Sequence, residues 1–184
     1  MLKNFSLIDL IKKRKSIRKY KDLEVPEDVI RSCIEAARLA PSAENSQPWR
    51  FVIIQNKEKI KELGKKAFSG IFSPTSFASN APVLIIVLAK LDILANKLGK
   101  FIRNVSFYQI DIGIAVEHLV LRAAEQGLGT CWIGWFNESA VRKFLNIPKI
   151  YKIPVIISMG YPQDLNIKST KRLSLEDIIL KWEK

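Results

Sequence analysis

The chain has 184 residues, of which 48% are hydrophobic, with only eight glycines and eight prolines, so we expect one folded domain over residues 1–184. The formal net charge of +12 at pH 7 favours an anionic ligand or partner. Two cysteines and one histidine are too few for a disulfide framework or a zinc site, and no apolar run reaches the roughly 20 residues of a membrane span, so we expect a cytoplasmic protein without a metal.

The first part of the chain alternates helical and extended patterns. Ser6 is placed to cap a short helix, and residues 14–20 alternate polar and apolar side chains, which predicts an extended segment. A second helix begins after Pro26 and leads into the polar corner from Pro41 to Trp49. This corner holds more Ser, Asn and Gln than a turn requires, which indicates a ligand-binding loop.

The rest of the chain predicts a sheet covered by helices. We expect strands at residues 49–55, 83–88, 130–133 and 154–159. We expect helices at residues 57–68 (polar and exposed), 101–126 (ended by Gly127) and 137–145, with a turn-rich connection at residues 70–82 and a last short helix after Ser174. Together these elements predict an α+β fold, with a mixed central sheet flanked by helices on both faces.

The helix at residues 101–126 is apolar on nearly all sides, which is typical of a helix buried at the centre of an assembly. A sheet of four strands cannot cover all of this apolar surface. We therefore expect an obligate homodimer that buries the long helix against its copy.

Six stretches, in chain order, resemble the FMN-dependent nitroreductase family. They are Arg14-x-Ser16-x-Arg18, the corner from Pro41 to Trp49, Asn80-Ala81-Pro82, Asp111-Ile112-Gly113-Ile114-Ala115, residues 127–134 and Gly160-Tyr161-Pro162. The similarity runs from about Leu7 to the end of the chain. It implies an intertwined homodimer that exchanges its C-terminal tails and holds each FMN between two subunits.

The resemblance also implies residues that bind FMN. Arg14, Lys15 and Ser16 are expected to contact the phosphate and the ribityl chain, and Lys171 or Arg172 to close on the phosphate from the tail. Which of the last two residues binds the phosphate stays open.

Three further groups complete the implied site. Arg18 is expected at the N1–C2 carbonyl edge of the flavin, where a cation raises the reduction potential. Backbone groups of Trp132, Ile133 and Gly134 are expected beside N5 and O4. From the partner subunit, the expected contacts are Pro41, Ser42, Ala43 and Asn45, whereas Gln47 and Trp49 are equally compatible with ligand binding and with bracing the corner.

The implied activity is a ping-pong reaction in which NADH or NADPH donates hydride to N5 of FMN and a nitroaromatic, a quinone or a similar acceptor then takes the electrons. The cofactor carries the chemistry, so no catalytic side chain is expected and His118 needs no catalytic role. Many family members have a small residue where this chain has Trp135. Its indole could narrow the substrate pocket, stack on an aromatic acceptor or point into the core.

Two other functions remain as alternatives. One is a flavoprotein dedicated to a single metabolite or to a protein electron donor. The other is a basic nucleic-acid-binding module, suggested by the basic run at residues 12–21. Against the second, the chain has no recognised nucleic-acid-binding signature and its aromatic residues do not alternate with its cations.

Overall fold

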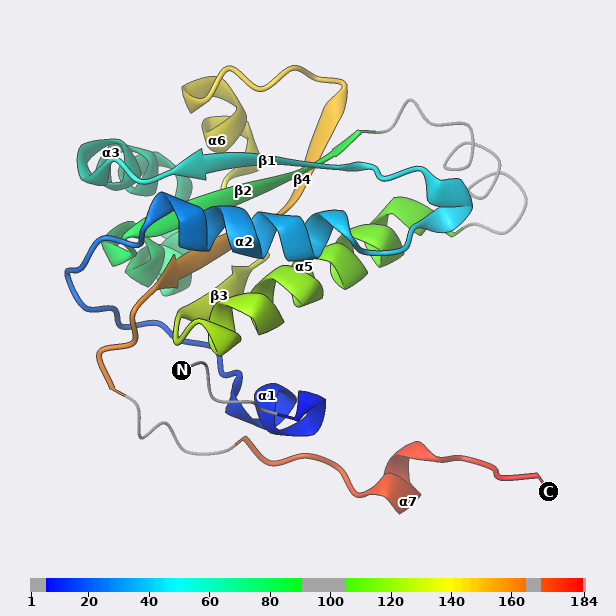
Figure 1. Cartoon of the computed structure of the whole chain (residues 1–184). Coiled ribbons are helices and arrows are strands. Elements are labelled where there is room, and N and C mark those ends of the chain that lie inside the picture. The colour runs from blue at the N-terminus through cyan, green and yellow to red at the C-terminus, as the bar shows by residue number, and fades with distance from the viewer. Residues whose placement is uncertain (1–5, 91–104, 165–169, 184) are drawn as a thin grey trace.

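The computed structural model describes residues 6–90, 105–164 and 170–183. Its centre is a four-stranded sheet in the order β1-β2-β4-β3 (Figure 1). The strands are β1 (Trp49–Ile54), β2 (Val83–Lys90), β3 (Gly129–Ile133) and β4 (Tyr151–Gly160).

All three neighbouring strand pairs run antiparallel. The predicted α+β class is therefore confirmed, but the mixed sheet is not found among these four strands. Helical connections such as the one between β1 and β2 return the chain to the same end of the sheet, so adjacent strands run in opposite directions. Within the described residues, parallel pairing occurs as a single bridge between Ser16 and Thr130. Thr130 belongs to β3, whereas Ser16 lies outside the four named strands.

Strand β2 is buried on both of its faces. Val83, Ile85 and Val87 belong to one hydrophobic cluster, and Leu84, Ile86 and Leu88 belong to another. Because successive side chains of a strand point to opposite faces, an uninterrupted apolar run is what a strand needs when helices cover both sides. The predicted helices on both faces are thus confirmed.

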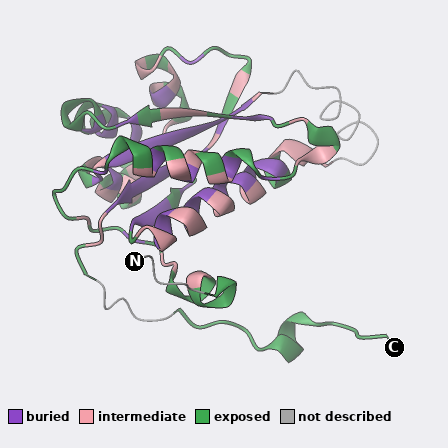
Figure 2. Cartoon of the chain, in the orientation of Figure 1, coloured by how far each residue is buried: buried purple, intermediate pink, exposed green. Residues whose placement is uncertain are grey.

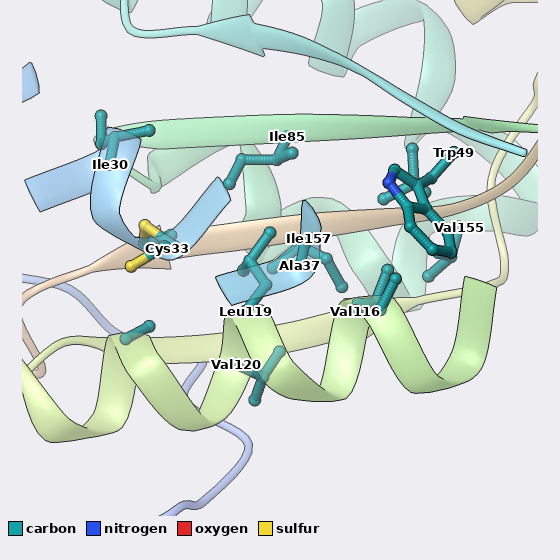
Figure 3. Close-up of a cluster of buried hydrophobic side chains, with 14 of the residues drawn as sticks. Ile30, Cys33, Ala37, Trp49, Ile85, Val116, Leu119, Val120, Val155 and Ile157 are labelled. Atoms are coloured by element: carbon teal, nitrogen blue, oxygen red, sulfur yellow. The ribbon is translucent and has the colours of Figure 1, made fainter. Parts of the chain in front are cut away.

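Helices α2 (Glu27–Arg38) and α5 (Phe107–Glu125) cover the first face of the sheet. In Figure 3, side chains of both helices meet the sheet around Ile85 and Ile157. Cys33 lies within this cluster and is completely buried, as expected for a cysteine that acts as a small core residue.

The second face is covered by α3 (Lys57–Ala67), the 3₁₀ segment η2 (Gly70–Asn80) and α6 (Glu138–Phe144). The prediction that α3 is exposed was wrong for one side of the helix, because Ile60, Leu63 and Ala67 are buried against the sheet. Because α3 contains many lysines, its sequence is polar on average, and the narrow apolar stripe was not predicted. The predicted cap of α6 is confirmed, since the side chain of Asn137 accepts a hydrogen bond from the Ala140 N–H at 3.0 Å.

Helix α5 has two different sides. Pairs of buried residues alternate with pairs of half-buried residues along its length, as the purple and pink bands in Figure 2 show. Leu119 faces the core and is completely buried, whereas Leu121 is half-buried and Ile110 is 52% exposed. The predicted first turn, residues 101–104, lies outside the described residues. Gly127 ends the helical region with a φ of +78°, as predicted.

The two ends of the chain carry short helices away from the sheet. Ser6 caps α1 (Leu7–Lys13), and Ser174 forms the predicted capping box of α7 (Leu175–Ile178). Residues 170–183 are exposed throughout and extend away from the body in Figure 1. Among the helices in the described ranges, none has the length and hydrophobicity required to span a bilayer.

Candidate cofactor site

An extended segment, residues 14–20, lies beside strand β3. The Ile17 N–H donates a hydrogen bond to the Thr130 carbonyl at 2.8 Å, and Ser16 forms the parallel bridge to Thr130. The close approach depends on Gly129, because a Cβ at this position would lie 2.4 Å from a side-chain carbon of Ile17. The prediction of an extended conformation is confirmed, whereas nothing in the sequence indicated that Gly129 would permit the contact.

Tyr20 fixes the far end of the same segment. Its hydroxyl donates to the Ile17 carbonyl at 2.6 Å and lies 2.7 Å from the hydroxyl oxygen of Ser158 on β4. Burial raises the pKa of the Tyr20 hydroxyl, which moves its ionisation still further above neutral pH. Sequence analysis missed Tyr20 as a bracing residue, because its partners lie 3 and 138 positions away along the chain.

The basic residues at the start of this segment border a cavity. Arg14 ends helix α1, and its side chain is 21% exposed. Arg14 and Lys15 line a cleft of about 500 Å³ together with residues 127–130. The Arg14 Nε atom lies 3.7 Å from a carboxylate oxygen of Glu117 on α5. Burial raises the pKa of Glu117, and the positive charge of Arg14 opposes that rise. The cleft therefore combines clustered cations with two nearby carboxylates, Asp164 in its lining and Glu117 beside Arg14.

Arg18 lies further along the segment, near the end of β3. Its side chain is exposed, and its guanidinium carbon is 5.8 Å from the centre of the Phe77 ring on η2. Burial raises the pKa of the Cys131 thiol, and the nearby charge of Arg18 partly lowers it. The structure thus places Arg18 between β3 and η2, beside the residues predicted to contact the flavin ring.

The residues predicted to contact the flavin ring, Trp132, Ile133 and Gly134, lie at the end of β3. Trp132 is 36% exposed and Ile133 is buried. Gly134 is exposed, and a Cβ added there would meet no atom within 4 Å. A planar ligand can therefore approach the backbone at Gly134 closely. The structure brings Arg14, Lys15, Ser16, Arg18, Trp132, Ile133 and Gly134 together along one edge of the sheet.

Trp135 follows directly and does not point into the core. Its side chain is 56% exposed, whereas the next residue, Phe136, is buried. The indole N–H donates a hydrogen bond to the Ile71 carbonyl at 2.8 Å. The structure therefore excludes the alternative that Trp135 points into the core, and it leaves the two alternatives in which the indole contacts or narrows a substrate pocket.

The polar corner stands at the beginning of α5. It contains the 3₁₀ turn η1 (Ala43–Asn45) and three residues with positive φ, namely Glu44 and Asn45 at 52° and Gln47 at 44°. Non-glycine residues rarely adopt this conformation unless the surroundings impose it, and such strain is common at ligand-binding sites. Trp49 is buried in the core cluster, which makes it a brace, while Gln47 is exposed.

Asp111 forms a hydrogen bond with the backbone of the polar corner. This residue on α5 is 3% exposed, and its Oδ1 atom accepts a hydrogen bond from the Ala43 N–H at 3.0 Å. Its Oδ2 atom and the hydroxyl of Ser46 are both buried. Burial raises the pKa of Asp111, and hydrogen bonding from the Ala43 N–H and from the Ser46 hydroxyl opposes the rise. Sequence analysis recognised Asp111 only as part of a motif and assigned it no contact.

Replacing Asp111 separates the roles of its charge and of its hydrogen bond. Asp111→Ala should lower the free energy of unfolding by about 1–3 kcal/mol, because the Ala43 N–H loses its acceptor. Asp111→Asn keeps an acceptor without the buried charge and should match or exceed the wild type at neutral pH. Because the folded-state pKa is raised, the ionised carboxylate destabilises the fold above that pKa, so the advantage of Asp111→Asn should shrink as the pH falls towards the ordinary value for Asp. Urea titrations at several pH values measure this, and an advantage that grows on acidification would contradict it.

The remaining predicted residues lie elsewhere in the chain. The corner with Pro41, Ser42, Ala43 and Asn45 is at the opposite end of α5 from β3 (Figure 1). Lys171 and Arg172 lie in the exposed tail, where the Arg172 guanidinium donates to the Lys171 carbonyl at 3.3 Å. Within one chain, the predicted residues at β3 therefore lie together, whereas those of the corner and of the tail lie apart from them.

The chain is similar to known proteins over most of its length. The Nitroreductase family model matches residues 11–76 and 72–161. A relative from Archaeoglobus fulgidus, named "Putative NADH dehydrogenase/NAD(P)H nitroreductase", is 32% identical over 85% of this chain and 86% of its own length. A relative from Thermotoga neapolitana, named "Iodotyrosine deiodinase", is 29% identical over 86% of this chain and 89% of its own length.

Solved structures show the same fold. The structure of an "FMN-dependent Nitroreductase" from Clostridium difficile R20291 superimposes with a TM-score of 0.77 at 30% identity, covering 97% of this chain and 99% of that one. The family match, the relatives and the shared architecture agree with the six motifs and with the residues gathered at β3. The chain belongs to the nitroreductase family.

Proposed function

We propose that the protein is an FMN-dependent oxidoreductase that uses NADH or NADPH to reduce nitroaromatics, quinones or similar electron-poor acceptors. The observation that carries this proposal is the arrangement along β3, where the cations of residues 14–18 and the open backbone at Gly134 lie on one extended edge. An elongated ligand with an anionic end and a planar end matches such an edge.

The residues present fit FMN by their chemistry. Arg14, Lys15 and Ser16 offer a guanidinium, an ammonium and a hydroxyl, which are groups that bind a phosphate and a polyol. Arg14 and Lys15 line a cleft of about 500 Å³, so a phosphate group can reach both side chains. Arg18 would then face the carbonyl edge of the ring, and the backbone at Trp132, Ile133 and Gly134 would border it.

Bound FMN would supply the hydride transfer, first from the nicotinamide and then to the acceptor. The chain contributes binding, orientation and charge. The contacts of Ile17 and Tyr20 keep residues 14–18 in an extended conformation, so their side chains are organised before a ligand binds. Arg18 supplies the positive charge that raises the reduction potential of the cofactor beside it.

The first test is the visible absorption spectrum of the purified protein, followed by titration with FMN and by NADH and NADPH oxidation assays. A yellow protein that oxidises either nicotinamide with a nitroarene as acceptor supports the proposal. A colourless protein that does not bind added FMN refutes it.

Arg18→Ala should lower the midpoint potential of the bound flavin by tens of millivolts, because a positive charge is lost beside the ring. Spectroelectrochemical titration measures the potential. Lys19→Ala, an exposed neighbour with the same change in charge, is the control and should shift the potential far less. Equal shifts in both variants would mean that only the net charge of the protein matters.

We also propose an obligate homodimer in which each site is shared between two subunits. The half-buried side of α5 offers a surface for a second copy, and the apolar tail, with Leu180 fully exposed and Trp182 74% exposed, offers a segment that could cross over to it. A two-fold axis beside α5 would carry the corner at one end of this helix towards β3 of the other subunit. The tail would bring Lys171 or Arg172 to the phosphate.

Mixed dimers test the sharing of sites. Arg14→Ala and Asn45→Ala each remove one side of every site, so each homodimer should bind FMN weakly. A heterodimer of the two variants has one intact site of two, so it should bind about half as much FMN as the wild-type dimer, and a random mixture, in which about half of the dimers are heterodimers, should recover about a quarter of the wild-type FMN content. Two copies of the same variant, unfolded and reassociated together, are the control. Absence of recovery in the mixture would contradict shared sites.

The Thermotoga relative favours one alternative, because the name of that protein describes a reaction on iodotyrosine rather than on a nitro group. In this alternative, the chain would serve one dedicated metabolite or a protein electron donor. Tight FMN binding combined with negligible NADH and NADPH oxidation would support it.

We place the protein in the cytoplasm on the basis of its two buried cysteines, Cys33 and Cys131, which are both free.

A further inference from the structure

Trp135 and Phe72 form an aromatic pair next to the exit of β3. The ring centres are 5.3 Å apart, and the ring planes are inclined by 52°. Trp135 is 56% exposed although it is the largest type of apolar side chain, and it follows directly after the open backbone of Gly134. The proposed function uses Gly134 but assigns nothing to this indole.

The indole is fixed in place by η2. Its N–H donates to the Ile71 carbonyl at 2.8 Å, and the Thr75 hydroxyl lies 2.8 Å from the carbonyl oxygen of Trp135 itself. Phe72, which lies between Ile71 and Thr75 in the chain, packs against the ring. A side chain that is held before a ligand arrives loses little conformational entropy on binding, so its exposed surface is organised for a contact.

The same η2 segment also reaches the proposed cofactor site. Phe77 lies under the guanidinium of Arg18, and Ile71 accepts the hydrogen bond from Trp135. Segment η2 therefore lies against both the cation assigned to the flavin ring and the exposed indole. A ligand at Gly134 would have the aromatic pair at its border.

We propose that Trp135 is a specificity-determining residue that stacks on planar, electron-poor aromatic acceptors and favours them over acceptors without a ring. This inference rests on the proposed function. The indole is an electron-rich π-system, and offset stacking on an electron-poor ring is favourable beyond the burial of area. The hydrogen bond to Ile71 and the packing of Phe72 hold the indole ready for that contact.

The test measures binding and selectivity in the FMN-loaded protein. Trp135→Leu should raise the dissociation constant of 4-nitroacetophenone, measured by equilibrium dialysis without nicotinamide, about tenfold, which is the size expected for a lost aromatic stack. The ratio of kcat/KM for 4-nitroacetophenone to that for ferricyanide, an acceptor without a ring, should fall by a similar factor. Trp135→Phe should recover most of both losses, because it keeps an aromatic ring.

Two further variants complete the design. Phe72→Leu keeps the indole but removes its support, and should raise the dissociation constant about threefold, so the inference stays testable if Trp135→Leu does not fold. Ile150→Ala is the matched control, because it removes an exposed apolar side chain just before β4, and it should leave the dissociation constant within twofold.

The outcomes separate the two proposals. If the wild type binds FMN and oxidises NADH or NADPH, but Trp135→Leu and Phe72→Leu keep the dissociation constant and the selectivity ratio of the wild type, the role of Trp135 is refuted and the proposed function stands. If the wild type binds no FMN, the proposed function fails and the role of Trp135 fails with it.

Discussion

Arg14→Ala should weaken FMN binding by roughly 10- to 100-fold, since a hydrogen bond to a charged group contributes about 1.5–3 kcal/mol and 1.4 kcal/mol corresponds to a factor of ten. The side chain is 21% exposed and borders the cleft at β3, so its charge is less screened than that of a surface cation. Arg14→Lys should give an intermediate affinity, because an ammonium cannot bind a phosphate through a bidentate contact. Titration of flavin fluorescence measures these affinities.

The control for Arg14 is Lys12→Ala, an exposed residue of the same helix with the same change in charge. Lys12→Ala should change the affinity for FMN less than twofold. The Arg14 variant should also raise the pKa of Glu117, because this partly buried carboxyl group would lose the cation that stabilises its ionised form. Equal losses of affinity in the Arg14 and Lys12 variants would point to a general effect of charge and against a phosphate site at Arg14.

Leu119→Ala should lower the free energy of unfolding by about 3 kcal/mol, within the range of 2–5 kcal/mol known for buried leucines. Leu119 is completely buried between α5 and the sheet, so its removal leaves a cavity. Urea denaturation followed by circular dichroism measures the change.

Leu121→Ala is the matched control, two positions further along the same helix. Leu121 is only half-buried and lies about 200° around the helix from Leu119. Its truncation should therefore cost less than about 1 kcal/mol in the folding of one chain. If the half-buried side of α5 is a dimer interface, Leu121→Ala should instead weaken dimerisation, which sedimentation at several concentrations detects. A similar loss of stability for both variants that does not depend on concentration would contradict the two-sided description of α5.

Local features of the fold followed from the sequence because they depend on neighbouring residues. The caps at Ser6, Asn137 and Ser174 each need an oxygen three residues before a free backbone N–H, and all three are present. The apolar run of β2 and the glycine that ends α5 are equally local signals. The motifs at residues 14–18 and 127–134 were both assigned to the flavin by resemblance, and only the structure shows that they lie along the same edge of the sheet.

The sequence by itself predicted most helices and strands, because these follow from short-range patterns, and its six motifs carried the resemblance to the family and to the residues of the candidate site. Only the tertiary structure decided the antiparallel direction of the strands, the buried stripe of α3, the contact of Asp111 with Ala43 and the exposed position of Trp135. Each of these depends on which distant segments pack together, as when Gly129 admits Ile17 or η2 accepts the indole N–H. A linear pattern does not specify such contacts, because their free energy arises only when the chain has brought both partners to the same place.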